Sequence, residues 1–478
     1  MTHVLSHNKR TARWPSGRRT KKPAEFVHVH LPDDGQEFLK SSPAMLIQEL
    51  GGASGSEQKE AAVRFREGNG RFKNCQYRDA ARLYRASFDV SESLSALLAQ
   101  GVALMMVSEL KQAAEVFEEG RILSRQREAG RFEASFGINL GQVCNDLGEP
   151  GRSRKALEEA RELSAEIDQP ALEAMALRHL GTTFLTQALY DDALATCEEA
   201  IQISEEVGDK TSVGHVLCNK ASFLASRGNL NDSEEVFRQC LTLGRETEDP
   251  YVLGRVHTNV ANLELIRGNA EEATLAIEKA LDIHRGIGYA QGEARNLGTL
   301  ALLQISQGNR DVGDQCHKNA VKIDRRLGYR RGEIRELFTM ARLHLQDAQV
   351  DEALQLLRSI SDLAKKIGHP RIQTESSVLI AYLLPDISIE ERVSVLEGHL
   401  ESRPSTDGPI LQILVSNILA GAYAELGLFD NAIGSCQWAV SESRNIGNLI
   451  EEARSLIALS CIQDAAGDNH LGAENVSK

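Results

Sequence analysis

The 478-residue sequence is poor in aromatic residues, at 5% of the chain, and contains only 11 prolines, a composition that favours helix. No run of about 18 uncharged apolar residues is present, so the sequence predicts no membrane-spanning helix. The N-terminus is basic but lacks the apolar segment of a signal peptide. With 42% hydrophobic residues the chain can still bury a large core, and we expect a cytoplasmic protein without membrane insertion.

Recognisable catalytic and metal-binding motifs are also missing. The eight cysteines are scattered singly, with no C-x-x-C and no His/Cys pair at zinc spacing. The sequence contains no H-E-x-x-H, no G-x-S-x-G and no phosphate-binding G-x-x-x-x-G-K-[ST]. His28 and His30 lie close together but have no further ligand nearby. We therefore expect no metal, no cofactor and no catalytic residues, and the protein is not predicted to be an enzyme.

What the sequence does contain is an internal repeat, recognised by a small residue that recurs along the chain. We number each repeat so that this small residue is place eight. It is found at Gly68, Gly101, Gly141, Gly181, Ala221, Ala261, Ala301, Ala341, Ala381, Ala420 and Ser460. From Gly101 to Ala381 every step is 40 residues, and chance does not produce seven identical steps.

Each unit reads as two helices joined by a turn. In the repeat of Ala261, apolar residues at helical spacing surround the small residue, and Gly268 then allows the chain to turn. A second helix carries the small residues Ala273 and Ala280, and Gly288 closes the unit. Small residues at these places let the two antiparallel helices approach closely.

This pattern resembles the tetratricopeptide repeat (TPR), in a longer form of 40 residues. The family's aromatic or apolar residue, four positions after the second small residue, is represented by Tyr84, Phe117, Leu157, Phe237 and Leu357. The family's tryptophan is missing, and glycine replaces its closing proline. The resemblance implies an all-α, right-handed solenoid of about ten helix-turn-helix repeats, followed by a C-terminal capping helix around residues 454–464. It implies a fold and says little about function.

Three segments follow from the repeat. Residues 59–467 are predicted to form the solenoid, with Pro385 in the turn of repeat nine and a loop over residues 403–409. Residues 1–58 form a basic arm and linker with seven positive charges before the first acid, Glu25, and residues 468–478 form a tail. The arm is interpreted as a solvated tail, or alternatively as a nuclear import signal or a segment that binds nucleic acid or anionic lipid.

The first helix of each pair is expected to line the concave groove of a TPR solenoid. At place two stand Arg255, Arg295 and Arg335, 40 residues apart, and at place nine stand Asn262 and Arg342. The sequence predicts that these five residues bind a peptide, because the guanidinium group can hold a carboxylate with two hydrogen bonds. The alternative is that the arginines form exposed ion pairs with acids such as Glu248 or Asp282 on preceding second helices.

Charge limits the kind of partner. The net charge is −14 for the whole chain and −21 for residues 23–478, which follow the seven basic residues, and this argues against a large nucleic-acid footprint except through the arm itself. The leading hypothesis is a non-enzymatic interaction scaffold or adaptor, whose groove binds an acidic or C-terminally carboxylated peptide, or a helix, of a partner protein. The alternative is a regulatory solenoid that senses a ligand or peptide and controls a separate effector.

Overall fold

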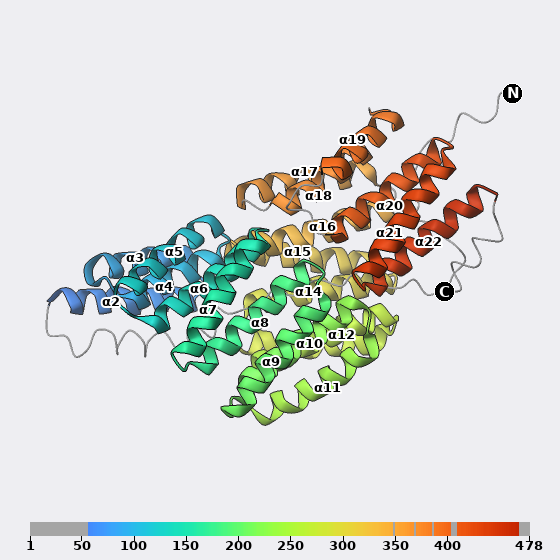
Figure 1. The fold of residues 1–478 in the computed structure, drawn as a ribbon. Coiled ribbons are helices and arrows are strands. Elements are labelled where there is room, and N and C mark those ends of the chain that lie inside the picture. The colour runs from blue at the N-terminus through green and yellow to red at the C-terminus, as the bar shows by residue number, and fades with distance from the viewer. Residues whose placement is uncertain (1–55, 348, 368–369, 385–386, 403–408, 468–478) are drawn as a thin grey trace.

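The computed structural model describes residues 56–467, except residues 348, 368–369, 385–386 and 403–408. In this part of the chain it contains 21 helices and no strand, which confirms the all-α prediction (Figure 1). The first helices of the ten pairs are α2 (Ser56–Lys73), α4 (Leu94–Met106), α6 (Gly130–Asp146), α8 (Pro170–Thr186), α10 (Lys210–Arg227), α12 (Pro250–Arg267), α14 (Ala290–Ser306), α16 (Arg330–Gln346), α18 (Pro370–Leu383) and α20 (Pro409–Glu425). The second helices are α3 (Tyr77–Ser91), α5 (Leu110–Gln126), α7 (Pro150–Glu166), α9 (Tyr190–Glu206), α11 (Leu230–Glu246), α13 (Ala270–Gly286), α15 (Arg310–Leu327), α17 (Val350–Ile367), α19 (Ile389–Ser402) and α21 (Phe429–Asn445). The predicted capping helix is α22 (Leu449–Ala465).

The turns between helices follow a stricter period than the sequence shows. From Ser108 to Gly328, every twentieth residue has a positive φ, so the left-handed conformation ends each helix of that region. Glycine supplies this conformation at the predicted turn positions, including Gly228 and Gly268. In the earlier repeats Ser108, Glu128 and other non-glycine residues adopt it too. Each 40-residue unit is therefore two helix-plus-turn halves of equal length.

The small residues at place eight are required by the packing of the two helices. A Cβ atom placed on Gly68 would lie 2.7 Å from the ring of Tyr84, and one placed on Gly101 would overlap the ring of Phe117. Ala261 and Ala301 are fully buried at the same place in later repeats. The predicted close approach of the two helices at a small residue is confirmed, and in the first two repeats the contact on the second helix is an aromatic ring.

Repeat nine departs from this regularity. Its helices α18 and α19 have 14 residues each, fewer than any other described helix except α4, and they pack against each other more sparsely than the two helices of any other pair. The turn predicted at Pro385 and the loop of residues 403–409 lie almost wholly outside the described residues, as do the arm, most of its linker, and the tail.

Successive turns of the superhelix touch each other. Leu327 joins the apolar core of the first repeats, and Arg331 at the start of α16 forms an ion pair with Asp146 at the end of α6. Further along, α22 contacts α10, and Figure 1 shows the C-terminal helices returning beside the middle of the chain. In both places the loop between two repeats contacts a loop that joins the two helices of an earlier repeat. The two loops lie about one turn of the superhelix apart along the chain.

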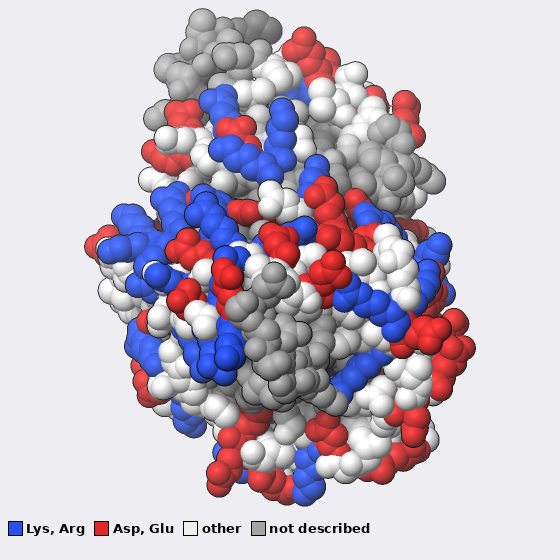
Figure 2. All heavy atoms as spheres, turned by 90° about the vertical axis from the view of Figure 1, so that its left-hand side faces the viewer, with Lys and Arg blue, Asp and Glu red and all other residues white. Residues whose placement is uncertain are grey.

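The second helices carry the charged outer surface. Figure 2 looks onto the N-terminal end, where acidic and basic side chains are interspersed. Some of them link consecutive second helices: Arg85 of α3 lies 3.0 Å from Glu119 of α5, and Arg121 of α5 lies 2.8 Å from Glu159 of α7. Such partly exposed pairs each contribute only about 0–1 kcal/mol, so the surface is chiefly a solvated face.

Candidate functional site

The first helices form the inner wall of the solenoid. Consecutive first helices contact one another from α4 to α16, whereas consecutive second helices make no comparable contacts within the described residues. Elements that converge in this way lie on the side of smaller radius. The five predicted site residues all belong to this wall, on α12, α14 and α16. The structure therefore places them on neighbouring helices, as their spacing predicted.

Arg255 is at the centre of a buried polar cluster between α10 and α12. Its side chain is only 6% exposed, and its guanidinium group donates to Asn219 Oδ1 at 2.7 Å and lies 3.2 Å from His215 Nδ1. His215 Nε2 in turn lies 3.9 Å from Asp249, which also caps the start of α12. The partners of Arg255 are thus an asparagine and a histidine of the preceding repeat, and not Glu248, which the alternative interpretation considered.

Cys218 lies in the same cluster, and among the described cysteines it is the one whose pKa is lowered. A hydrogen bond from Cys240 lowers the pKa of Cys218 to about 6, and the nearby charges of Arg255 and His215 act in the same direction against the effect of burial. Asn259 also donates to the Cys218 sulfur, at 3.4 Å. The cluster therefore favours negative charge at a position that the described fold buries completely.

Asn262 belongs to a polar ladder that links consecutive first helices. It accepts a hydrogen bond from Thr299 at place six of the next repeat, and Asn259 donates in the same way to Ser222 of the preceding repeat. Place six is polar and buried throughout this region, with His179, Asn219, Asn259, Thr299 and Thr339. Buried polar groups need such partners, so the ladder fixes the register between repeats.

Arg295 and Arg335 lie next to buried carboxylates of repeats seven and eight. Arg335 donates to Glu336 at 2.9 Å and lies 3.8 Å from Asp324 of α15, while Glu336 bonds to His317 at 2.9 Å. Burial raises the pKa of Asp324 to about 7, although the charges of Arg335 and Arg295 oppose the shift. Arg295 itself is 8% exposed. These two arginines thus belong to the inner wall and also interact with the buried carboxylates of the protein itself.

Arg342 is the most accessible of the predicted residues. Its side chain is 41% exposed and lies 3.8 Å from Glu375 of α18. Phe338, one helical turn earlier on α16, is half-buried on the same helix. A ligand that enters the inner wall near repeat eight would meet Arg342 before the more deeply placed arginines.

The sequence interpretation found the arginines but missed the groups that hold them. Asn219, Asp324, Glu336 and His317 were not predicted as parts of the site. One signal was available, because place six carries a polar residue in six consecutive repeats, from Asn139 to Thr339.

The described residues contain no helix that is long and apolar enough to cross a membrane. In the same part of the chain, no three His, Cys, Asp or Glu side chains are grouped so that they could hold a metal ion.

The fold and its inner wall define a TPR-type helical solenoid. The family of MalT-like TPR regions matches residues 121–392, more than half of the sequence, and the chain belongs to this family. No curated protein matches the sequence.

Solved structures with a similar helical arrangement share little sequence with this chain. A Rap protein in complex with competence and sporulation factor shows 13% identity and a TM-score of 0.48, with 81% of this chain and 98% of the other covered. The apo form of the quorum sensor NprR from B. thuringiensis shows 14% identity and a TM-score of 0.46, with coverage of 74% and 99%. A signal-transduction ATPase with a tetratricopeptide repeat sensor from Pyrococcus horikoshii shows 16% identity and a TM-score of 0.44, with coverage of 71% and 55%.

Proposed function

We propose that the chain is a non-enzymatic, cytoplasmic interaction scaffold that binds an acidic or C-terminally carboxylated peptide of a partner protein on its inner wall. The binding residues are Arg255, Asn262, Arg295, Arg335 and Arg342, on three consecutive first helices. A solenoid offers such an extended inner surface because each repeat adds one more helix to the same wall.

The observation that carries this proposal is the environment of Arg255. A buried charge is costly unless a counter-charge accompanies it. Within the described residues no carboxylate lies at ion-pair distance from Arg255, and its two hydrogen-bond partners are an amide oxygen and an imidazole nitrogen. Asp249, an acid of the same cluster, lies 3.9 Å from His215. A ligand carboxylate near α12 would give Arg255 a carboxylate partner, in addition to the Cys218 sulfur, whose lowered pKa already favours negative charge.

Arg342 would give the ligand its first contact, because it is the accessible arginine of the set. Half-buried Ile266 and Ile305 on α12 and α14 would add apolar contacts along the same wall. Since net charge outside the arm is strongly negative, a basic stretch of the wall would attract an anionic segment that the rest of the surface repels.

The test compares partner capture by immobilised full-length protein and by two charge-reversal variants, with mass spectrometry as the readout. Arg342→Glu places a negative charge on the inner wall. Arg238→Glu is the matched control, because Arg238 is 62% exposed on the outer helix α11. We expect Arg342→Glu to lose the partners of the wild type and Arg238→Glu to retain them. If both folded variants capture those partners with unchanged yield, the proposal is wrong.

A regulatory solenoid is the second candidate, favoured by the contacts between successive superhelical turns. A ligand that changes the curvature of the inner wall would alter these contacts, for example that between Tyr190 and Asn448. Fluorescent labels on α9 and α22 would report such a change. A ligand-dependent change in energy transfer supports regulation, whereas ligand binding without any change supports a passive scaffold.

A further inference from the structure

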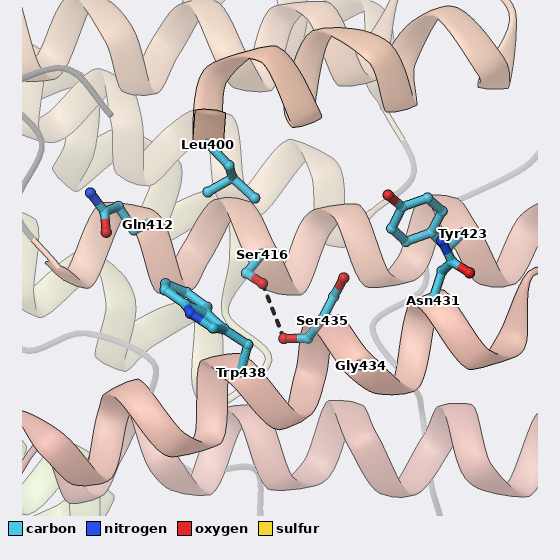
Figure 3. A pocket seen from close by; sticks show the side chains of 8 residues that line it. All are labelled: Leu400, Gln412, Ser416, Tyr423, Asn431, Gly434, Ser435 and Trp438. Carbon is cyan, nitrogen blue, oxygen red and sulfur yellow. Dashed lines mark hydrogen bonds between the residues drawn. The ribbon is translucent and has the colours of Figure 1, made fainter. Parts of the chain in front are cut away.

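A surface cavity of about 370 Å³ opens beside the irregular repeat nine (Figure 3). Its lining comes from α19, α20 and α21. Because α19 and α21 are second helices, the cavity lies on their side of the solenoid and away from the inner wall. Because α18 and α19 pack together sparsely, α19 does not close over α21 as in a tight helical stack. The cavity is large enough for a small ligand or for one large side chain.

The lining of the cavity is neutral and contains two aromatic rings. Trp438 stands at one end and is 36% exposed, and Tyr423 and Asn431 stand at the other end (Figure 3). Leu400 covers one side, and the carboxamides of Gln412 and Asn431 supply hydrogen-bonding groups. Among the described residues no charged side chain lines the cavity, and the nearby carboxylate of Glu397 accepts a hydrogen bond from the Tyr423 hydroxyl.

The cavity depends on residues of α21 that differ from those at the same places of α13. When the repeats are aligned on Ala261 and Ala420, helix α13 has three exposed residues, Glu272, Leu275 and Lys279, where α21 has Asn431, Gly434 and Trp438. Compared with α13, helix α21 therefore lacks the charged side chains at two of these places and has the indole ring of Trp438 next to a glycine. A Cβ atom on Gly434 would meet nothing within 4 Å. This local change is what a neutral, ring-binding site requires.

We propose that this cavity binds an aromatic residue within a peptide segment of a partner protein, at a second site separate from the inner wall. The ring of the ligand would stack against Trp438, since aromatic pairs in contact are favourable beyond the area that they bury. The carboxamides of Gln412 and Asn431 would pair with the peptide groups on either side of the ring. Because the lining is neutral, the ligand residue proposed for this cavity is aromatic and uncharged, whereas the ligand proposed for the inner wall is anionic.

Trp438 itself reports the binding. The chain has only one other tryptophan, Trp14, so full-length Trp14→Phe protein has a single tryptophan signal. We would titrate it with N-acetylphenylalaninamide, which carries a ring and two amides, and with N-acetylalaninamide, which lacks the ring. We expect a saturable change in Trp438 emission only with the first, with a Kd of about 1 mM, which is ordinary for a ligand of about 15 non-hydrogen atoms.

Two leucine substitutions in the same background locate the site. Gly434→Leu adds a side chain at a cavity-lining position where a Cβ atom meets nothing within 4 Å, and it is expected to weaken binding at least about fivefold. Gly286→Leu is the matched control, because it is also a helical glycine whose Cβ would meet nothing within 4 Å. The proposal is overturned by an unsaturable signal, by equal binding to Gly434→Leu, or by equal changes with both amides. Equal affinity for p-cresol would also overturn it, since the peptide groups would then contribute nothing.

Discussion

The side-chain amide of Asn448 donates a hydrogen bond to the hydroxyl of Tyr190 at 2.6 Å, although 258 positions separate the two residues. The contact joins the start of α22 to the start of α9, one superhelical turn earlier. Arg331 and Asp146 make a corresponding contact nearer the N-terminus. A solenoid whose repeats touch only their sequence neighbours has no such contacts. Here they set the pitch, and with it the width of the space enclosed by the inner wall.

The first prediction concerns this pitch. A Cβ atom on Gly228 would lie 2.7 Å from Leu449 Cβ, whereas one on Gly268 would meet nothing within 4 Å. Both glycines have a positive φ, so alanine strains the backbone at either site. We therefore expect Gly228→Ala to increase the radius of gyration measured by small-angle X-ray scattering, and Gly268→Ala to leave it unchanged. Equal values for the two variants would show that the contact does not hold the turns together.

The second prediction concerns the small residues of the first helices. Ala301 is fully buried, and Ala301→Leu should force the helices of its repeat apart at a cost of about 1–3 kcal/mol in the free energy of unfolding. The control is Ala165→Leu at an exposed position of α7. Thermal and denaturant unfolding followed by circular dichroism would measure both. An equally stable Ala301→Leu protein would contradict the assigned register of the repeats.

The third prediction concerns Asp324. Burial raises its pKa to about 7, from 3.8 in the unfolded chain. Between these pH values the folded protein retains a proton that the unfolded chain has released, so this group favours folding at low pH. Its contribution is lost as the pH rises from about 4 to about 7, and three pKa units correspond to at most about 4 kcal/mol. The charged groups around it are Arg335, Glu336, Arg295 and Glu333.

Urea unfolding at pH 5 and pH 8 tests this expectation. Asp324→Asn should gain stability relative to the wild type as the pH rises, because the variant has no carboxyl group to ionise. Asp311→Asn, at an exposed position of the same helix, should follow the wild type. Parallel behaviour of all three proteins would mean that Asp324 ionises as freely in the folded protein as in the unfolded chain.

The fourth prediction concerns the charge of the inner wall. If an anionic peptide binds near Arg255 and Arg342, its Kd should rise with salt concentration, since the exposed part of the attraction is screened. The dependence should be weaker in Arg342→Gln, which removes one charge and keeps a polar side chain. Arg255→Gln should weaken binding more uniformly, because its charge is buried and less screened. A salt-independent Kd in the wild type would exclude an electrostatic mode of binding.

Much of this fold follows from local rules. The small residues at place eight and the glycines of the turns mark the helix pairs because packing distance and backbone conformation act within one repeat. The partners of the arginines do not follow from such rules. Arg255 bonds to Asn219 in the preceding repeat, and Arg335 of α16 lies close to Asp324 of α15, the last helix of the preceding repeat. Those contacts depend on the angle between repeats, which the period of 40 residues leaves open.

The longest-range features were also beyond sequence reasoning. The contact of Asn448 with Tyr190 depends on the accumulated twist of several repeats, and a small change per repeat would move the two residues apart. The cavity of Trp438 depends on how repeat nine fits between its neighbours, where the regular period is interrupted. In both cases the relationship between the residues depends on how distant repeats are arranged in the superhelix.

The central claim, that partners bind on the inner wall, is tested most directly by site-specific photo-crosslinking. A photoreactive phenylalanine analogue would replace Phe338 on α16 of the inner wall, or exposed Leu275 on the outer helix α13. After irradiation with captured partner, mass spectrometry would identify the crosslinked peptides. We predict crosslinks to an acidic or C-terminal partner peptide from position 338 and none from position 275. Crosslinks from position 275 alone would contradict the account.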